Sequence, residues 1–100
     1  MPDLPELNPV IHGKLRLALL SLLAGVVEAE FTWLRAKTGS TDGNLGAQLA
    51  KLEEAGYVRV TKRFEKNKPQ SLYRMTDAGR DALTEYVRSL KQLLGGAIGD

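Results

Sequence analysis

The chain has 100 residues, 43% of them apolar, which is the size and composition of one small folded domain. Its formal net charge of +2 indicates only a mild preference for anionic partners. The absence of cysteine excludes disulfides and thiolate metal sites, and a chain this short has no room for a catalytic domain with a large enclosed pocket.

No apolar run reaches the roughly 18 to 20 residues that are needed to span a bilayer. The first seven residues, MPDLPEL, contain acids and prolines and lack the basic start of a signal peptide. We therefore expect a soluble, cytoplasmic protein with no membrane partner, in which residues 1–7 form a flexible tail.

The first helix is predicted to begin at Asn8 and Pro9, because asparagine is a favoured N-cap and proline suits the first helical position. Apolar residues recur at helical spacing from Ile11 onward, and their stripe is wide enough to be covered on two sides. Gly25 is a typical end for this helix. Residues 26–30 are then predicted to form a very short strand.

Two short helices follow, over residues 31–37 and 41–55. Leu34 anchors the first of them, and three leucines at helical spacing form one face of the second. The turn between the two helices contains Gly39, which is typical of a helix-turn-helix pair. Gly56 stands where a C-terminal cap glycine is expected.

The apolar period then changes to strand alternation over residues 57–62 and 72–75, with turn-forming residues at 66–69, which predicts a β-hairpin. Thr76 is expected to cap a last helix whose apolar seam resembles a short coiled coil. Gly95 and Gly96 should end that helix. The predicted fold is therefore α+β and mostly α, with one domain over residues 8–94 and a flexible tail over residues 95–100.

We find no catalytic constellation in the sequence. The single histidine, His12, is interpreted as a surface or interface side chain, and Glu53 and Glu54 point in different directions on a helix. Metal-ligand spacing and a phosphate-binding glycine loop are absent from the sequence. We therefore expect no enzyme activity, no metal and no cofactor, and no effector can be named.

The strongest chemical signal is a concentration of positive charge in the predicted hairpin. Between residues 59 and 74 the chain has six basic residues and one acid, so this segment carries +5 and the remainder carries −3. A basic hairpin on a slightly acidic body favours an anionic partner such as nucleic acid. The alternative is that lysines on an exposed hairpin only prevent association between sheet edges.

In a helix-turn-helix, the second helix presents its N-terminal residues to base edges in the major groove. Here that helix has small residues in its opening turns, namely Gly43, Gly46 and Ala47, which would let its backbone approach a groove wall closely. Asn44 and Gln48 lie on its flank and can pair bidentately with adenine. The alternative is that the small residues pack against another helix of the same fold.

The stretch TDGNLGAQLAKLEEAGYV, followed by the basic hairpin and YRMTDAGRDAL, resembles the winged-helix transcriptional regulators of the MarR-like and ArsR-like superfamily. The match covers about residues 8–94 and is closest to the small, one-domain members of archaea and bacteria. Met75 replaces the usual leucine before the last helix. Gly46 and Ala47 replace the serine and arginine of many relatives, so this helix carries no arginine for guanine readout.

The resemblance implies a homodimer on a pseudo-palindromic operator, with residues 41–55 as the recognition helix and residues 62–70 as the wing. Within these elements we expect base or groove contacts from Ser40, Thr41, Asp42, Asn44, Gln48 and Lys51. We expect contacts with the DNA backbone from Arg35, Lys37, Lys62, Arg63, Lys66 and Lys68.

Dimerisation also follows from the apolar surplus on the first and last helices. The expected interface residues are Val10, Ile11, Leu15, Leu83, Tyr86, Leu90, Leu93 and Leu94. The alternative is that these helices pack only on each other within one subunit.

We interpret Asp42 as a helix-dipole residue that could also accept from a cytosine amine. The leading function is a sequence-specific regulator that binds double-stranded DNA and depends strongly on DNA shape and dimer spacing. The second is a winged helix that serves as a protein-binding or assembly module.

Overall fold

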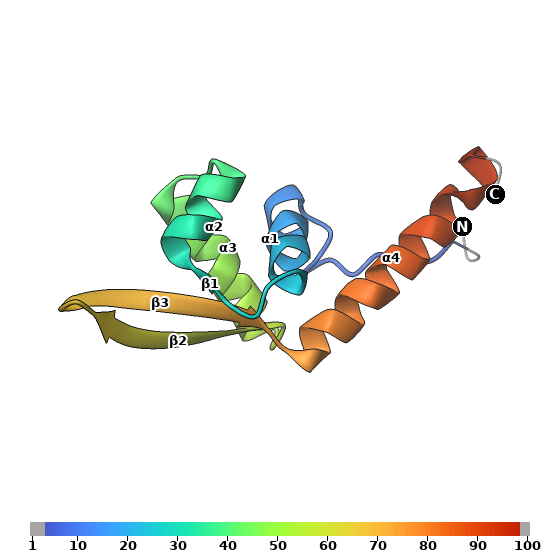
Figure 1. Ribbon diagram of the computed structural model, residues 1–100. Helices are drawn as coiled ribbons and strands as arrows, with labels where there is room; N and C mark the ends of the chain where they lie inside the picture. Colours follow the sequence, from blue (N-terminus) through green and yellow to red (C-terminus); the bar gives the residue numbers. More distant parts are fainter. Residues whose placement is uncertain (1–3, 99–100) are drawn as a thin grey trace.

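The computed structural model describes residues 4–98 and the side chains up to residue 95. The elements in chain order are α1 (Lys14–Ala24), β1 (Ala29–Glu30), α2 (Phe31–Thr38), α3 (Asp42–Glu54), β2 (Val58–Glu65), β3 (Lys68–Met75) and α4 (Asp77–Ile98). The predicted order of elements and the α+β, mostly α fold are confirmed. In Figure 1 the first three helices lie together above the sheet, while the hairpin and α4 project to opposite sides.

The core is built from leucines that the first three helices supply at helical spacing. Leu19, Leu20 and Leu23 of α1 meet Leu34 of α2, and all four are buried. The apolar face of α3 closes this cluster with Leu45, Leu49 and Leu52, each 1% exposed or less. The opposite side of α3 is thereby left in solvent.

The sheet has the strand order β1-β3-β2 and is antiparallel throughout. The hairpin is longer than the sequence indicated, because Glu65 pairs with Lys68 and the turn consists of Lys66 and Asn67 alone. Both turn residues have positive φ, 51° and 63°, as a two-residue turn that follows the strand twist requires. Lys68 and Pro69, predicted as part of the turn, belong to β3.

The first helix begins later than predicted. Asn8 instead caps a separate turn. Its Oδ1 accepts from the Val10 amide at 2.9 Å, and its backbone carbonyl accepts from the His12 backbone amide at 2.8 Å. Gly13 then adopts an extended conformation, and α1 starts at Lys14. The Asn8–Pro9 prediction was wrong because asparagine stabilises isolated turns as well as helix starts.

Two glycines determine how the chain passes from α3 into the hairpin and how the start of α4 packs after it. Gly56 has a φ of 82° and ends α3, and the amide after it donates to the Leu52 carbonyl at 3.0 Å, which confirms the cap. At the other end, Thr76 Oγ1 accepts from the Gly79 amide at 3.0 Å, which confirms the N-cap of α4. A Cβ on Gly79 would lie 2.9 Å from the Tyr57 carbonyl carbon, so this close approach requires glycine.

Helix α4 continues to Ile98, so the prediction that Gly95 and Gly96 end it was wrong. Once a helix exists, each added residue gains a hydrogen bond, which offsets the cost of glycine. At the other end of the chain, Leu7 packs against the core although it was placed in the predicted tail. Residues 1–3 and 99–100 of the two predicted tails lie outside the described residues.

Candidate nucleic-acid interface

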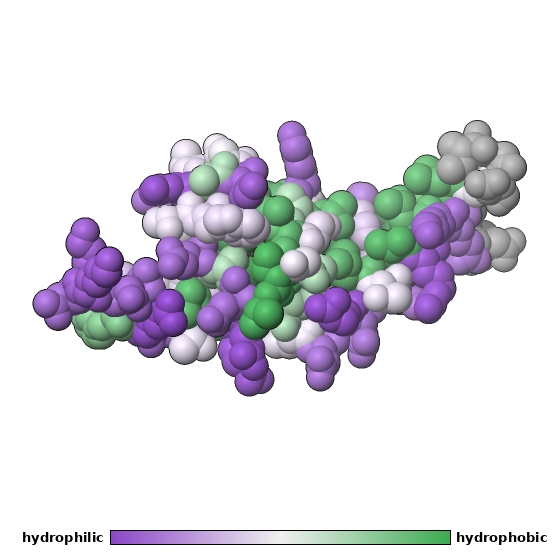
Figure 2. Space-filling view, in the orientation of Figure 1, coloured by the Kyte–Doolittle hydropathy of each residue, from purple (hydrophilic) through white to green (hydrophobic). Residues whose placement is uncertain are grey.

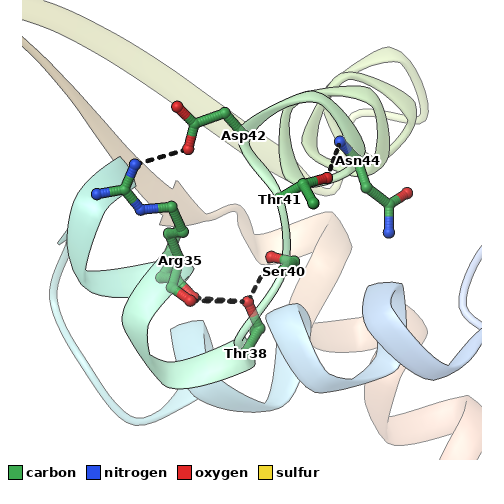
Figure 3. Close-up of polar contacts among 7 residues, drawn as sticks. Arg35, Thr38, Ser40, Thr41, Asp42 and Asn44 are labelled. Atoms are coloured by element: carbon green, nitrogen blue, oxygen red, sulfur yellow. Dashed lines mark hydrogen bonds and ion pairs between the residues drawn. The ribbon is translucent and has the colours of Figure 1, made fainter.

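The helix-turn-helix is held together by short polar contacts around its turn (Figure 3). Thr41 is the N-cap of α3, and its Oγ1 accepts from the Asn44 amide at 3.2 Å. Thr38 and Ser40 share a hydroxyl hydrogen bond of 2.7 Å, and Gly39 ends α2 with a φ of 66°. The predicted groove residues Ser40, Thr41 and Asn44 are therefore brought together at the start of α3.

Two predicted DNA-contacting residues in this region are paired with each other. Arg35 Nη1 lies 2.7 Å from Asp42 Oδ1, and this ion pair joins α2 to the first turn of α3. Asp42 also lies at the positive end of the α3 dipole, as the sequence indicated. Lys37 lies 5.5 Å from the centre of the Trp33 ring, so its ammonium is placed over an aromatic face.

The exposed side of α3 is bare in its opening turns. Gly43 is exposed and Gly46 partly so, and apart from the adjacent residues and the backbone of α3 itself, no atom of the described residues lies within 4 Å of where a Cβ would stand on either. The alternative that these glycines pack against another helix of the same subunit is therefore wrong. Ala47 is exposed beside them. A groove wall could approach the α3 backbone here without displacing a long side chain.

The flank of α3 carries an ordered polar chain that reaches α1. Arg16 Nη1 donates to Gln48 Oε1, and Gln48 Nε2 donates to Asn44 Oδ1 at 3.2 Å. Sequence reasoning missed Arg16. The sequence contained no signal for it, because the helix was expected to begin at Asn8, which placed Arg16 in the helix interior; only the later start at Lys14 puts it in the first turn. Lys51 lies farther along α3, where it lines a shallow hollow with Arg16 and Glu54.

The wing projects from the body with a mostly hydrophilic surface that is interrupted by an apolar area (Figure 2), and Phe64 of β2 is 77% exposed. Lys62, Lys66 and Lys68 are exposed, and within the described part of the chain none of them forms an ion pair. Arg63 Nε donates to Gln70 Oε1 at 3.2 Å, and Gln70 Nε2 donates to a Glu30 carboxylate oxygen at 3.1 Å. The three lysines are thus available to bind phosphates. Arg63, in contrast, is hydrogen-bonded to Gln70, which is itself bonded to Glu30 of β1.

The residues that were expected to form a dimer interface differ in burial: some lie in the core of the subunit and others keep exposed surface. Ile11 is 0% exposed and Tyr86 is 4% exposed, so both belong to the core of one subunit. Tyr86 also shares a hydrogen bond of 2.8 Å with His12 Nδ1 through its hydroxyl, and the His12 side chain is otherwise exposed. We leave Ile11 and Tyr86 out of any interface with a second copy.

The remaining predicted interface residues keep part of their surface. Val10, Leu15, Leu83, Leu90 and Leu93 are partly buried, and Leu94 is exposed. Sequence reasoning missed Val87, which is 40% exposed and lies one turn from Leu83 on the same side of α4. Its signal was the spacing of four, three and four that connects residues 83, 87, 90 and 94.

Within residues 4–98 no helix is both long and apolar enough to cross a membrane. Over the same residues, no three histidine or acidic side chains come together as a potential metal site.

A helix-turn-helix with an exposed second helix, joined to a basic two-stranded wing, defines the class of winged-helix DNA-binding proteins. The chain belongs to the winged helix DNA-binding domain family, whose model matches residues 15–94. It is 36% identical over 84 residues to the uncharacterized protein MJ0432 of Methanocaldococcus jannaschii, covering 84% of this chain and 91% of that protein.

Solved structures agree with this assignment. A transcriptional regulator homologue from Pyrococcus horikoshii OT3 superposes with a TM-score of 0.83 at 25% identity, covering 89% of this chain and 88% of that one. A protein of Enterococcus faecalis V583 with a provisional assignment as a MarR-family transcriptional regulator has a TM-score of 0.67 at 30% identity, covering 83% and 74%. The family and these neighbours support a DNA-binding regulator rather than an enzyme.

Proposed function

We propose that the protein is a sequence-specific regulator that binds double-stranded DNA as a homodimer on a pseudo-palindromic operator. In this proposal α3 enters the major groove and the wing lies along the DNA backbone. The observation that carries the proposal is the open surface at Gly43 and Gly46, which no other element of the described chain covers and which lies next to the exposed Asn44. Glycine in a helix interior costs stability, and a close approach of the backbone to a ligand is one use that offsets this cost.

The distribution of charge supports the same partner. Hairpin residues 59–74 carry +5, and the lysines near the tip are exposed without ion-pair partners in the described chain. Such lysines can neutralise phosphates and release counterions, which is the main source of affinity for duplex DNA. The dipole of α3 adds a further attraction for a phosphate at Thr41.

The dimer is supported by the exposed side of α4. Leu83, Val87, Leu90 and Leu94 lie on one side of this helix, and Val87 and Leu94 are 40% and 41% exposed. The end of α4 projects beyond the body in Figure 1, where no other helix or strand of the described chain covers it. Apolar residues nevertheless continue along this helix in Figure 2. A second copy of α4, related by a two-fold axis, would cover this apolar side.

A two-fold dimer would present two recognition helices to one side of the duplex. Half-sites centred one helical turn apart, about 34 to 36 Å, suit this arrangement. The few base-reading side chains on α3 then make spacing and DNA shape important for specificity.

The direct test is a salt titration of binding to duplex DNA, performed with the wild type and with a wing variant in which Lys62, Arg63, Lys66 and Lys68 are replaced by glutamate. We expect wild-type affinity to fall steeply as salt rises, with a logarithmic slope of about −0.9 per neutralised phosphate. The wing variant should bind weakly at low salt. Undetectable wild-type binding at low salt, or equal binding by the two proteins, would contradict the proposal. A stoichiometric protein partner captured without nucleic acid would support the assembly module instead.

A further inference from the structure

Arg16 occupies an unfavourable position in α1 that its hydrogen bonds make up for. It lies in the first turn, which contains no acidic residue, so its charge opposes the helix dipole. The guanidinium is nevertheless held in place, since Nε donates to the Val10 carbonyl and Nη2 donates to the Pro9 carbonyl at 3.3 Å. Gly13 leaves space for it, because a Cβ there would lie 3.0 Å from Arg16 Nη2. The arginine is thus fixed with one nitrogen directed at α3.

The third contact of Arg16 sets the orientation of two amides on α3. Arginine has donors and no acceptor, so Gln48 must turn its oxygen towards Nη1. The Gln48 nitrogen then points to Asn44 and donates to Oδ1 at 3.2 Å. The Asn44 side-chain nitrogen is then left without a hydrogen-bond partner among the described residues. We call this chain of hydrogen bonds, from Arg16 through Gln48 to Asn44, the relay. Its direction follows from Arg16, whose guanidinium can only donate.

We propose that Arg16 is a specificity-determining positioning residue, which makes Gln48 and Asn44 present N–H groups to the DNA. This inference rests on the proposed function and deepens it. A flank that offers donors selects base edges that offer acceptors, such as guanine O6 and N7 or thymine O4. It disfavours the bidentate pairing of Gln48 with adenine, because that pairing needs the same Oε1 that Arg16 holds. The site therefore prefers acceptor-rich positions opposite the start of α3.

The test is a selection from randomised duplexes with the wild type, Arg16→Ala and Lys14→Ala. Lys14 is the matched control, because it is an exposed cation in the same turn of α1 and, within the described residues, its side chain makes no hydrogen bond to α3. We expect the wild type and Lys14→Ala to enrich guanine or thymine at one position in each half-site. Arg16→Ala should reduce that preference by about tenfold. Its affinity for unselected DNA should match that of Lys14→Ala.

Gln48→Leu is the second variant, since it removes the middle of the relay and leaves Arg16 bonded to Val10 and Pro9. It should lose the same base preference even if Arg16→Ala fails to fold. An unchanged selected sequence in a folded Gln48→Leu or Arg16→Ala protein would overturn the proposal. A uniform loss of affinity for all duplexes in Arg16→Ala alone would also overturn it, because that result identifies a phosphate contact.

A measurement without DNA separates this inference from the proposed function. In the free protein, the side-chain amide of Gln48 should be rigid by ¹⁵N relaxation in the wild type and in Lys14→Ala. It should become mobile in Arg16→Ala. An amide that is equally mobile in all three proteins would overturn the positioning role of Arg16, whatever the protein binds. A rigid amide together with undetectable duplex binding would instead mean that the proposed function has failed.

Discussion

Arg35 and Asp42 form an ion pair of 2.7 Å that joins the two helices of the helix-turn-helix at the edge of the proposed DNA surface. Both side chains are well exposed, at 46% and 67%, so solvent screens the pair and it adds less than about 1 kcal/mol to stability. In the proposed complex its larger effect would be electrostatic, because Asp42 would offset the Arg35 charge towards an approaching phosphate and add a negative charge beside it. We therefore expect the pair to moderate general attraction to DNA.

Replacing Asp42 with asparagine should raise the affinity for DNA of any sequence. The variant removes a negative charge and frees Arg35, so the salt dependence should become steeper by about 0.9 in logarithmic slope. The loss of a favourable helix-dipole charge should cost about 0.3 to 1 kcal/mol of stability. A fluorescence anisotropy titration over several salt concentrations measures the first effect and urea unfolding measures the second. Unchanged affinity and slope would show that Arg35 does not face the DNA.

Replacing Gly46 with alanine should separate stability from function. The new methyl group meets open space within the described structure, and alanine favours the helix, so the free energy of unfolding should rise by up to about 1 kcal/mol. Affinity for the selected DNA should fall, and the larger Gly46→Gln change should lower it further while the fold remains stable. Urea unfolding and DNA titration on the same samples provide the two values. Full affinity in Gly46→Gln would rule out a close approach of the α3 backbone.

Replacing Gly79 with alanine should have the opposite effect on stability. The added Cβ would collide with the Tyr57 backbone, so α4 must shift at its first turn, at a cost of about 1 to 3 kcal/mol. Denaturant unfolding checks the prediction, with Ala78→Ser as a control on the preceding, exposed position of α4. A Gly79→Ala protein as stable as the wild type would mean that the first turn of α4 does not pack against the Tyr57 backbone as described.

Replacing Val87 with glutamate should weaken the proposed dimer without unfolding the subunit. The change places a charge at the centre of the apolar side of α4, where a second copy would bury it at a cost of several kcal/mol. Gln92→Glu is the control, since residue 92 is exposed on the opposite side of the same helix. Sedimentation equilibrium should show a monomer only for Val87→Glu. A dimer of unchanged affinity in this variant would place the interface elsewhere.

The sequence predicted the elements whose signals are local and periodic. Leu45, Leu49 and Leu52 defined the buried side of α3, and Gly56 and Thr76 marked helix ends that the structure confirms. Local signals failed where one sequence motif is compatible with two different local structures. Asn8 could start a helix or close a turn, and in the structure it closes a turn through its hydrogen bond from the Val10 amide.

The missing part of the candidate site depends on contacts between residues distant in the sequence. Arg16 and Gln48 are 32 residues apart, and no spacing rule connects a cation on α1 with an amide on α3. Likewise, the sequence placed Tyr86 in the apolar seam of the last helix. Only the fold shows that its ring is in the core while Val87 faces outward. Periodicity identified the apolar residues of α4 but could not assign each one to its partner.

The central claim is that two copies of α3 read one duplex, and a selection of the wild-type protein against randomised DNA tests it most directly. The selected sites should contain an inverted repeat with half-site centres about 34 to 36 Å apart, or one helical turn. The repeat should depend on spacing, so that inserting half a turn between half-sites abolishes tight binding. Single half-sites, or no enriched sequence, would contradict the claim.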